Sequence, residues 1–126
     1  MKRTDFSVDW LFAACAPDTE LLPWNAQFTP VDLPHDWQIR HADDLYRDGT
    51  LFYRKYFFVT DVPGTRRMLW FGGAYMDTTV FVNGTEVGQW KYGYMSFWFD
   101  ITDALHEGQN EVLVRCNLRH PLSLIH

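Results

Sequence analysis

The sequence of 126 residues is poor in cysteine and has no long apolar segment. Its two cysteines, Cys15 and Cys116, lie far apart, with no Cys-x-x-Cys spacing and no histidine at metal-ligand spacing. They are expected to be a reduced, buried pair, since a disulfide would need Cα atoms within about 7 Å of each other. No apolar run reaches the ~20 residues of a membrane span, and no apolar signal segment follows Met1-Lys2-Arg3. These absences predict a cytoplasmic protein with no membrane partner.

Positive charge is also sparse. Eleven Lys and Arg residues are scattered among sixteen Asp and Glu, which gives a formal net charge of −5. A protein without a basic face is not expected to bind nucleic acid or an acidic membrane surface. Aromatic residues, in contrast, make up 17% of the chain, with ten Phe, six Trp and six Tyr. Such rings favour pleated sheets and can stack on the apolar faces of sugars, although most rings in a soluble domain fill its core.

Short extended segments separated by turn residues predict an all-β sandwich or barrel, and a double-sheet jelly roll is one such arrangement. Asn83-Gly84 is the strongest hairpin signal, because a type I′ turn needs positive φ at both central positions. One short helix is expected at 102–108, with Thr102 as its N-cap and Gly108 as the left-handed residue that ends it. Trp10-Leu11-Phe12 fits either a short strand or a packed arm. The predicted strands span residues 51–60, 68–71, 78–82, 86–90, 95–99 and 112–116.

Two polar motifs have a structural explanation. His35 and Asp36 are neighbours in an extended segment and point to opposite faces, so they are expected to clasp a loop while Trp37 fills the core. Arg54 lies in an aromatic strand, where a buried guanidinium needs a carboxylate that Asp36 or Asp77 could supply. The functional alternative places Arg54 against a sugar hydroxyl at a domain boundary.

The His35-Asp36-Trp37 segment, the Arg54 strand and the Asn83-Gly84 turn follow one another along the chain, and their sequence resembles the N-terminal sugar-binding domain of glycoside hydrolase family 2. The resemblance covers about residues 24–121 and includes several short elements, none of them specific alone. It implies a galactose-binding-domain-like jelly roll that packs against a catalytic (β/α)-barrel in a much longer, β-galactosidase-like enzyme. The matching elements are Leu33-Pro34-His35-Asp36-Trp37, Tyr53-Arg54-Lys55 with Phe57 and Val59, Phe71-Gly72-Gly73, Val80-Phe81-Val82-Asn83-Gly84, Gly88, Gly93-Tyr94 with Phe97, Asp100-Ile101-Thr102, and Asn110 with Val114-Arg115.

The resemblance also divides the chain. Residues 1–23 are expected to form an N-terminal arm, residues 24–121 the family 2 domain, and residues 122–126 a tail outside the family pattern. Because this tail replaces the segment that normally leads into one more strand, the jelly roll is expected to lack its last strand. The sheet edge left open could pair with a partner or with a second copy of the chain.

Two carbohydrate-facing sites are predicted, with carbohydrate as the partner and no cofactor. In the family, the loop before the Tyr-Arg-Lys strand lends residues to the rim of the sugar pocket, which here means Arg47, Asp48 and Gly49 by loop position. As an alternative, the chain is a free-standing carbohydrate-binding module with an aromatic stacking platform. That platform would comprise Trp90, Tyr92, Tyr94 and Trp98.

No catalytic or metal site is expected in this chain. Glycoside hydrolysis needs two carboxyl groups roughly 5–10 Å apart, and the resemblance implies that both catalytic glutamates belong to the barrel. The acidic pairs found here occupy turns and helix ends, where carboxylates cap backbone N–H groups or meet solvent. The sequence contains no Gly-x-Ser-x-Gly elbow, and its five histidines form no His-x-His or His-Glu-x-x-His spacing. The acidic pairs are Asp43 with Asp44, Asp100 with Asp103, and Glu107 with Glu111.

Overall fold

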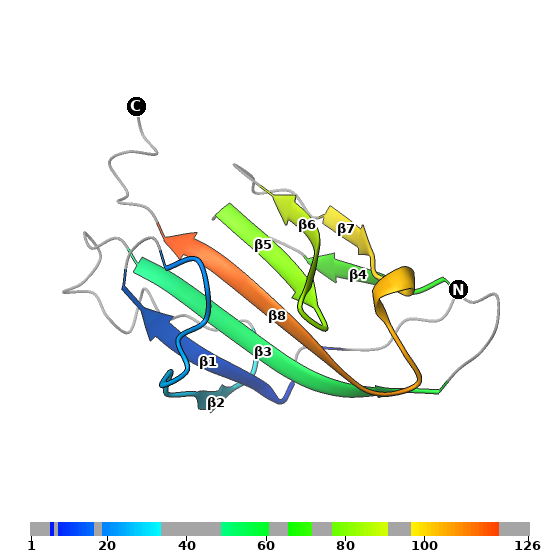
Figure 1. Ribbon diagram of the computed structural model, residues 1–126, viewed down its shortest axis with the longest axis horizontal. Helices are drawn as coiled ribbons and strands as arrows, with labels where there is room; N and C mark the ends of the chain where they lie inside the picture. Colours follow the sequence, from blue (N-terminus) through cyan, green and yellow to red (C-terminus); the bar gives the residue numbers. More distant parts are fainter. Residues whose placement is uncertain are drawn as a thin grey trace.

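The computed structural model describes residues 6, 8–16, 19–33, 49–60, 66–71, 77–90 and 97–118. In these residues, eight strands form a six-stranded sheet with the order β2-β1-β3-β8-β5-β6 and a two-stranded sheet, β4-β7 (Figure 1). Within the same ranges, no helix is long and apolar enough to cross a membrane. The elements are β1 (Trp10–Cys15), β2 (Thr29–Val31), β3 (Gly49–Val59), β4 (Met68–Phe71), β5 (Asp77–Val82), β6 (Thr85–Trp90), β7 (Phe97–Asp100), the 3₁₀ turn η2 (Thr102–Ala104) and β8 (Gly108–Leu118).

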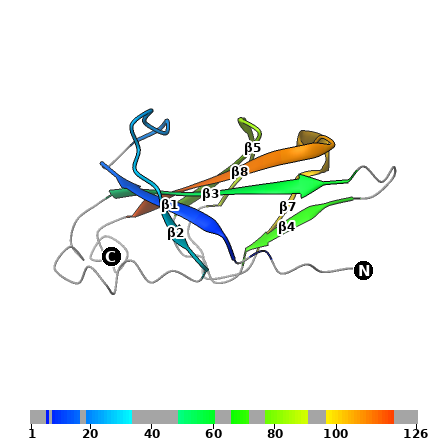
Figure 2. The ribbon, with the colours of Figure 1, turned by 90° about the horizontal axis from the view of Figure 1, so that it is seen from below.

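The two sheets form two layers. Figure 2 shows β4 and β7 below one end of the larger sheet, so the all-β sandwich that the sequence predicts is confirmed. The described part of the smaller sheet has two strands, and the absence of a last strand stays a prediction. Side chains from both sheets fill the space between the layers. This core comprises Trp10, Phe12, Leu51, Tyr53, Leu69, Val80, Val82, Ile101, Val112, Val114 and Cys116.

The antiparallel pair β3–β8 runs through the middle of the larger sheet. Its register is continuous from Gly49 opposite Leu118 to Val59 opposite Gly108. Alternation sends Val112 and Val114 inward, where they are buried, as the period of two in a strand requires. β8 is longer than the predicted 112–116 because it pairs with β3 over its whole length and also with β5, a tertiary effect that local sequence does not reveal.

β1 is a strand of the larger sheet. Trp10–Cys15 pairs with both β2 and β3, so the structure selects the strand from the two alternatives for Trp10-Leu11-Phe12. The Trp10 ring is 2% exposed, and its indole N–H donates a hydrogen bond of 2.6 Å to the carbonyl of Phe6. The sheet therefore includes residues 10–15 of the segment that was expected to be an arm.

The hairpin prediction is confirmed, and the helix prediction is confirmed only in part, since Gly108 has the positive φ expected of it, 101°. Asn83 and Gly84 both have positive φ, 51° and 84°, and they join β5 to β6. The predicted helix at 102–108 is only the single 3₁₀ turn η2, and Thr102 does not cap it, because the N-cap position is Ile101 without a side-chain bond. The Thr102 hydroxyl instead accepts a hydrogen bond from the backbone N–H of Arg67.

One glycine lets the layers approach each other. A Cβ atom on Gly88 in β6 would overlap the ring of Phe99 in β7. Phe99 is half-buried and packs against the core cluster. A residue with a side chain at this point would push the Phe99 ring out, so the contact between β6 and the smaller sheet depends on glycine.

Candidate functional site

Of the three residues predicted at the rim of the sugar pocket, Arg47, Asp48 and Gly49, the structure describes only Gly49. Gly49 opens β3 opposite Leu118, and a Cβ atom on it would lie 3.7 Å from the Cys15 carbonyl oxygen, an ordinary contact. Arg47 and Asp48 lie outside the described residues, so their place at a sugar pocket stays a prediction.

The predicted stacking platform is described in part. Trp98 in β7 is 48% exposed, whereas Tyr92, Tyr94 and the side chain of Trp90 lie outside the described residues. Trp98 stands directly opposite Trp70 in β4, which is 52% exposed. The two ring centroids are 6.0 Å apart with an interplanar angle of 45°. The structure thus adds Trp70, which the sequence reasoning missed because the pairing of β4 with β7 was unknown.

Asp100, one of the carboxylates considered as acid–base candidates, has a structural role. Asp100 Oδ1 accepts the backbone N–H of Thr102 at 3.0 Å, and Oδ2 lies 3.7 Å from Nη1 of Arg66. The hydrogen bonds from the Thr102 side chain and backbone, with a smaller contribution from Arg66, lower the pKa of Asp100. Asp100 is therefore a turn-forming anion, and general acids in glycosidases need the opposite shift. Asp43 and Asp44 lie outside the described residues.

Arg54 has the carboxylate partner that its position requires. Its Nε lies 2.9 Å from Oε2 of Glu111, close enough for an ion pair although the N–H is not aligned for a hydrogen bond. The guanidinium also lies over the ring of Phe28, 4.6 Å from its centroid. Asp36 and the side chain of Asp77, the partners predicted for Arg54, lie outside the described residues. His35 and Trp37 also lie outside them, so the predicted loop role of these residues stays a prediction. The ion pair gives Glu111, one of the carboxylates considered as acid–base candidates, a structural role.

The cysteines are not activated nucleophiles. Both are free, and burial raises the pKa of Cys116 to about 11, partly opposed by its contact with the Thr78 hydroxyl. Burial also raises the pKa of Cys15, which is half-buried. Because the thiolate is the reactive form, both groups are mainly unreactive thiols at neutral pH.

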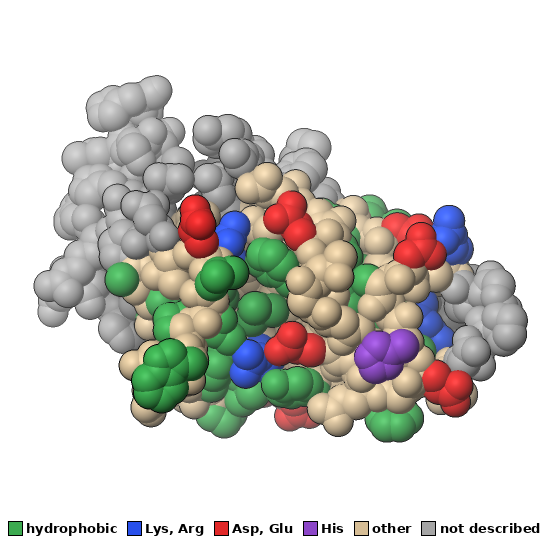
Figure 3. All heavy atoms as spheres, viewed as in Figure 1, with side chains coloured by type: hydrophobic (Ala, Val, Ile, Leu, Met, Phe, Trp, Pro, Cys, Tyr) green, Lys and Arg blue, Asp and Glu red, His purple; other side chains and the backbone are tan. Residues whose placement is uncertain are grey.

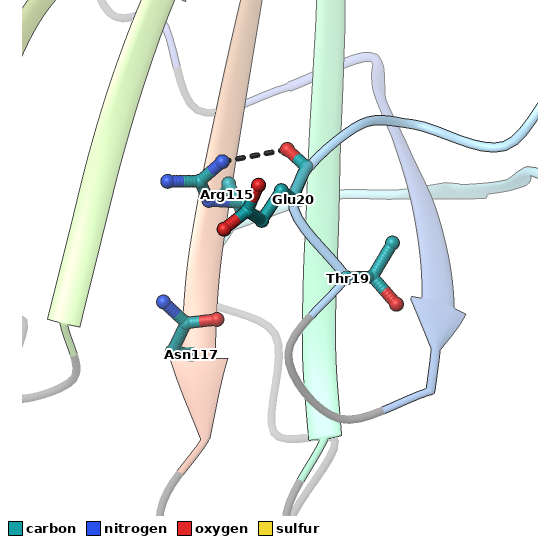
Figure 4. Close-up of a pocket in the computed structure, with 4 residues that line it drawn as sticks. All are labelled: Thr19, Glu20, Arg115 and Asn117. Atoms are coloured by element: carbon teal, nitrogen blue, oxygen red, sulfur yellow. Dashed lines mark hydrogen bonds between the residues drawn. The ribbon is translucent and has the colours of Figure 1, made fainter.

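A shallow pocket lies on the outer face of the larger sheet, lined by Thr19, Glu20, Arg115 and Asn117 (Figure 4). Its volume is about 130 Å³, below the roughly 300–1,000 Å³ of ligand pockets. The Arg115 guanidinium donates a 2.6 Å bond to the carbonyl of Glu20 and a 3.3 Å bond to the Thr79 hydroxyl. These bonds hold the segment that precedes β2 against strand β8. We therefore assign the pocket a structural role and not a ligand-binding one.

The outer face of the larger sheet shows mixed chemistry. Figure 3 views this face and shows hydrophobic side chains interspersed with acidic and basic ones over the sheet. Within the described residues, no group of three His, Cys, Asp or Glu side chains is placed to hold a metal ion.

Proteins of similar sequence and structure indicate the family to which this sandwich belongs. No protein-family model matches the chain. The chain is 33% identical to a β-galactosidase of Bacteroides ovatus over 89% of its own length and 15% of that protein. It is 33% identical to a β-glucuronidase of Bacteroides fragilis over 81% of its length and 16% of that protein. The structure of a glycosyl hydrolase family 2 member from Bacteroides cellulosilyticus matches with a TM-score of 0.77 and 30% identity, over 92% of this chain and 18% of that one.

The fold and these matches define a β-sandwich domain of a carbohydrate-active enzyme. The chain belongs to glycoside hydrolase family 2. It spans 12–16% of the length of the curated relatives that it matches, and so corresponds to a domain-sized part of them.

Proposed function

We propose that this chain is a non-catalytic domain that supports the sugar pocket of a family 2 glycosidase, while a separate barrel domain performs hydrolysis of the glycosidic bond. The observation that carries the proposal is the coverage: 89% of this chain matches only 15% of a β-galactosidase. The contacts of Asp100 with Thr102 and of Glu111 with Arg54 support it, because they give both carboxylates a structural role in the described part of the chain.

Within this proposal, Arg47, Asp48 and Gly49 contribute to the rim of the pocket. Gly49 supports this placement because it is the first residue of β3, at the end of the sandwich where β8 finishes. A β-galactoside-type substrate is the proposed class, since the relatives include β-galactosidases as well as β-glucuronidases. We further propose a reducing, cytoplasmic location, in which Cys15 and Cys116 remain free thiols.

The test is hydrolysis of chromogenic β-galactosides and β-glucuronides by the purified chain. We expect no turnover above the uncatalysed rate, because the proposal assigns the acid–base pair to a separate barrel domain. Successive purification steps, with turnover per mole of chain followed at each step, separate activity of this chain from contamination. Turnover that stays proportional to the amount of folded chain through these steps would overturn the proposal.

A further inference from the structure

The turn between β5 and β6 has a chemically labile sequence. Asn83 is followed by Gly84, and both are exposed in the turn that joins the two strands. Because glycine has no side chain, its backbone nitrogen is unhindered and can attack the side-chain amide carbon of the asparagine before it. The other asparagines, Asn25, Asn110 and Asn117, precede alanine, glutamate and leucine. Asn83 is therefore the asparagine of this chain that deamidates most readily when the chain is unfolded.

The fold holds the Asn83 side chain away from this reaction. Its Nδ2 donates to the Ala104 carbonyl and to Oδ1 of Asn110, both at 2.8 Å. Its Oδ1 accepts the backbone N–H of Glu111 at 3.0 Å. We call these bonds, together with the other side-chain bonds of Asn110, the Asn110 network. Attack by the Gly84 nitrogen needs the amide to rotate back toward its own backbone, and departure of Nδ2 needs both of its bonds to break. Deamidation therefore requires that the network opens first.

The network has no place for the product of deamidation. A carboxylate at position 83 has no N–H to donate, so its oxygen would face the Ala104 carbonyl and Oδ1 of Asn110, which are both acceptors. Asn110 is 1% exposed, and turning its amide to offer Nδ2 would break the bonds of Nδ2 to the carbonyls of His106 and Gly108. An isoaspartyl product also adds a main-chain carbon to a turn whose length sets the register of the hairpin. Both products are therefore expected to destabilise the fold.

We propose that Asn83 is a deamidation site, protected while the Asn110 network is closed and modified irreversibly when the network opens. In the open state the Gly84 nitrogen loses its proton to solvent and forms a bond to Cγ of Asn83. The bond from Cγ to Nδ2 breaks, Nδ2 takes a proton from solvent and leaves as ammonia, and a succinimide ring remains. Water then opens the ring to aspartate or isoaspartate. Since the closed network does not accommodate either product, the turn records loss of the native fold and prevents its recovery.

The test is the rate of deamidation at each asparagine of the 126-residue chain, measured by peptide mass spectrometry in buffer and in urea at one pH and temperature. In urea, Asn83 should be modified fastest. In buffer its rate should fall at least about tenfold, because three hydrogen bonds must open before the reaction. Asn25 is exposed and serves as the internal reference, so its rate should change much less. Equal rates at Asn83 in buffer and in urea would overturn the proposal.

Two variants separate the network from overall stability. Asn110→Ala removes one acceptor of the Asn83 amide, whereas Trp10→Ala destabilises the core at a site outside the network. With both variants folded in buffer, Asn110→Ala should speed deamidation of Asn83 more than Trp10→Ala does. The opposite order, or equal acceleration, would show that global unfolding controls the rate and would contradict protection by the network.

The variant Asn83→Asp reproduces the aspartyl product. It should lower the midpoint of urea unfolding, because its carboxylate faces two acceptors. Asn25→Asp makes the same change of charge at an exposed position and should leave the midpoint unchanged. A midpoint for Asn83→Asp equal to that of the parent chain would overturn the claim that the modification is incompatible with the fold. These measurements involve neither sugar nor hydrolysis, so their outcome is independent of the proposed function.

Discussion

Replacing Trp10 with alanine is expected to lower the free energy of unfolding by about 4 kcal/mol. Trp10 is 2% exposed in the core between the layers, its N–H bonds the Phe6 carbonyl, and its ring meets the Phe6 ring edge-on at 5.9 Å. The substitution therefore leaves a large cavity and loses a hydrogen bond. Since a domain of this kind is stable by only about 5–15 kcal/mol, the loss should be plain in urea or thermal unfolding.

Trp24 provides the matched control for this experiment. It is the same residue type but 96% exposed, so Trp24→Ala should change the stability by less than about 0.5 kcal/mol. Equal, small losses from Trp10→Ala and Trp24→Ala would contradict the placement of β1 in the core.

Replacing Asn110 with alanine is expected to cost about 3 kcal/mol of stability. Asn110 is 1% exposed and forms four hydrogen bonds at the start of β8. Its Oδ1 accepts from the Asn83 side chain at 2.8 Å and from the His106 N–H at 3.0 Å. Its Nδ2 donates to the carbonyls of His106 and Gly108. Alanine would remove all four bonds and leave the space of a fully buried side chain unfilled.

The neighbouring Gln109 is exposed, so Gln109→Ala is the control for the loss of an amide in the same strand. Urea unfolding of the two variants should differ by more than about 2 kcal/mol. A difference near zero would show that solvent replaces the bonds of Asn110 and that this network does not stabilise the junction of β8 with the β5–β6 hairpin.

The Asn110 network shows what the sequence could and could not predict. The Asn83-Gly84 turn was predicted because its backbone requirement is local, and positive φ at both residues confirms it. The Asn83 side chain, however, acts on Asn110 and on the N–H of Glu111, far along the chain. Such partners depend on how β5 pairs with β8, which no local pattern reveals.

Competing hydrogen bonds to the backbone of residues 102–108 explain why the helix predicted there is limited to one turn. Asn110 takes the N–H of His106, which a helix at 102–108 would bond to the carbonyl of Thr102. That carbonyl instead accepts the N–H of Leu105 at 3.4 Å, so the segment remains a single 3₁₀ turn.

The exposed pair Trp70 and Trp98 in the smaller sheet could also be predicted only in part from the sequence. Trp98 was predicted as part of a platform, but its partner in the structure is Trp70, from a different predicted strand. A period of two in residues 68–71 indicates that Met68 and Trp70 share a face. It does not show which strand lies beside them, and the register of β4 with β7 supplies that information.

The most direct measurement of the central claim is a domain replacement in the Bacteroides ovatus β-galactosidase. The stretch of that enzyme that this chain matches would be exchanged for this chain, and hydrolysis of a chromogenic β-galactoside would be compared with an enzyme lacking the stretch. Our account predicts that the exchange restores hydrolysis that the deletion removes, because this sandwich supports a pocket whose chemistry lies elsewhere. A folded exchange variant that hydrolyses no faster than the deletion variant would contradict it.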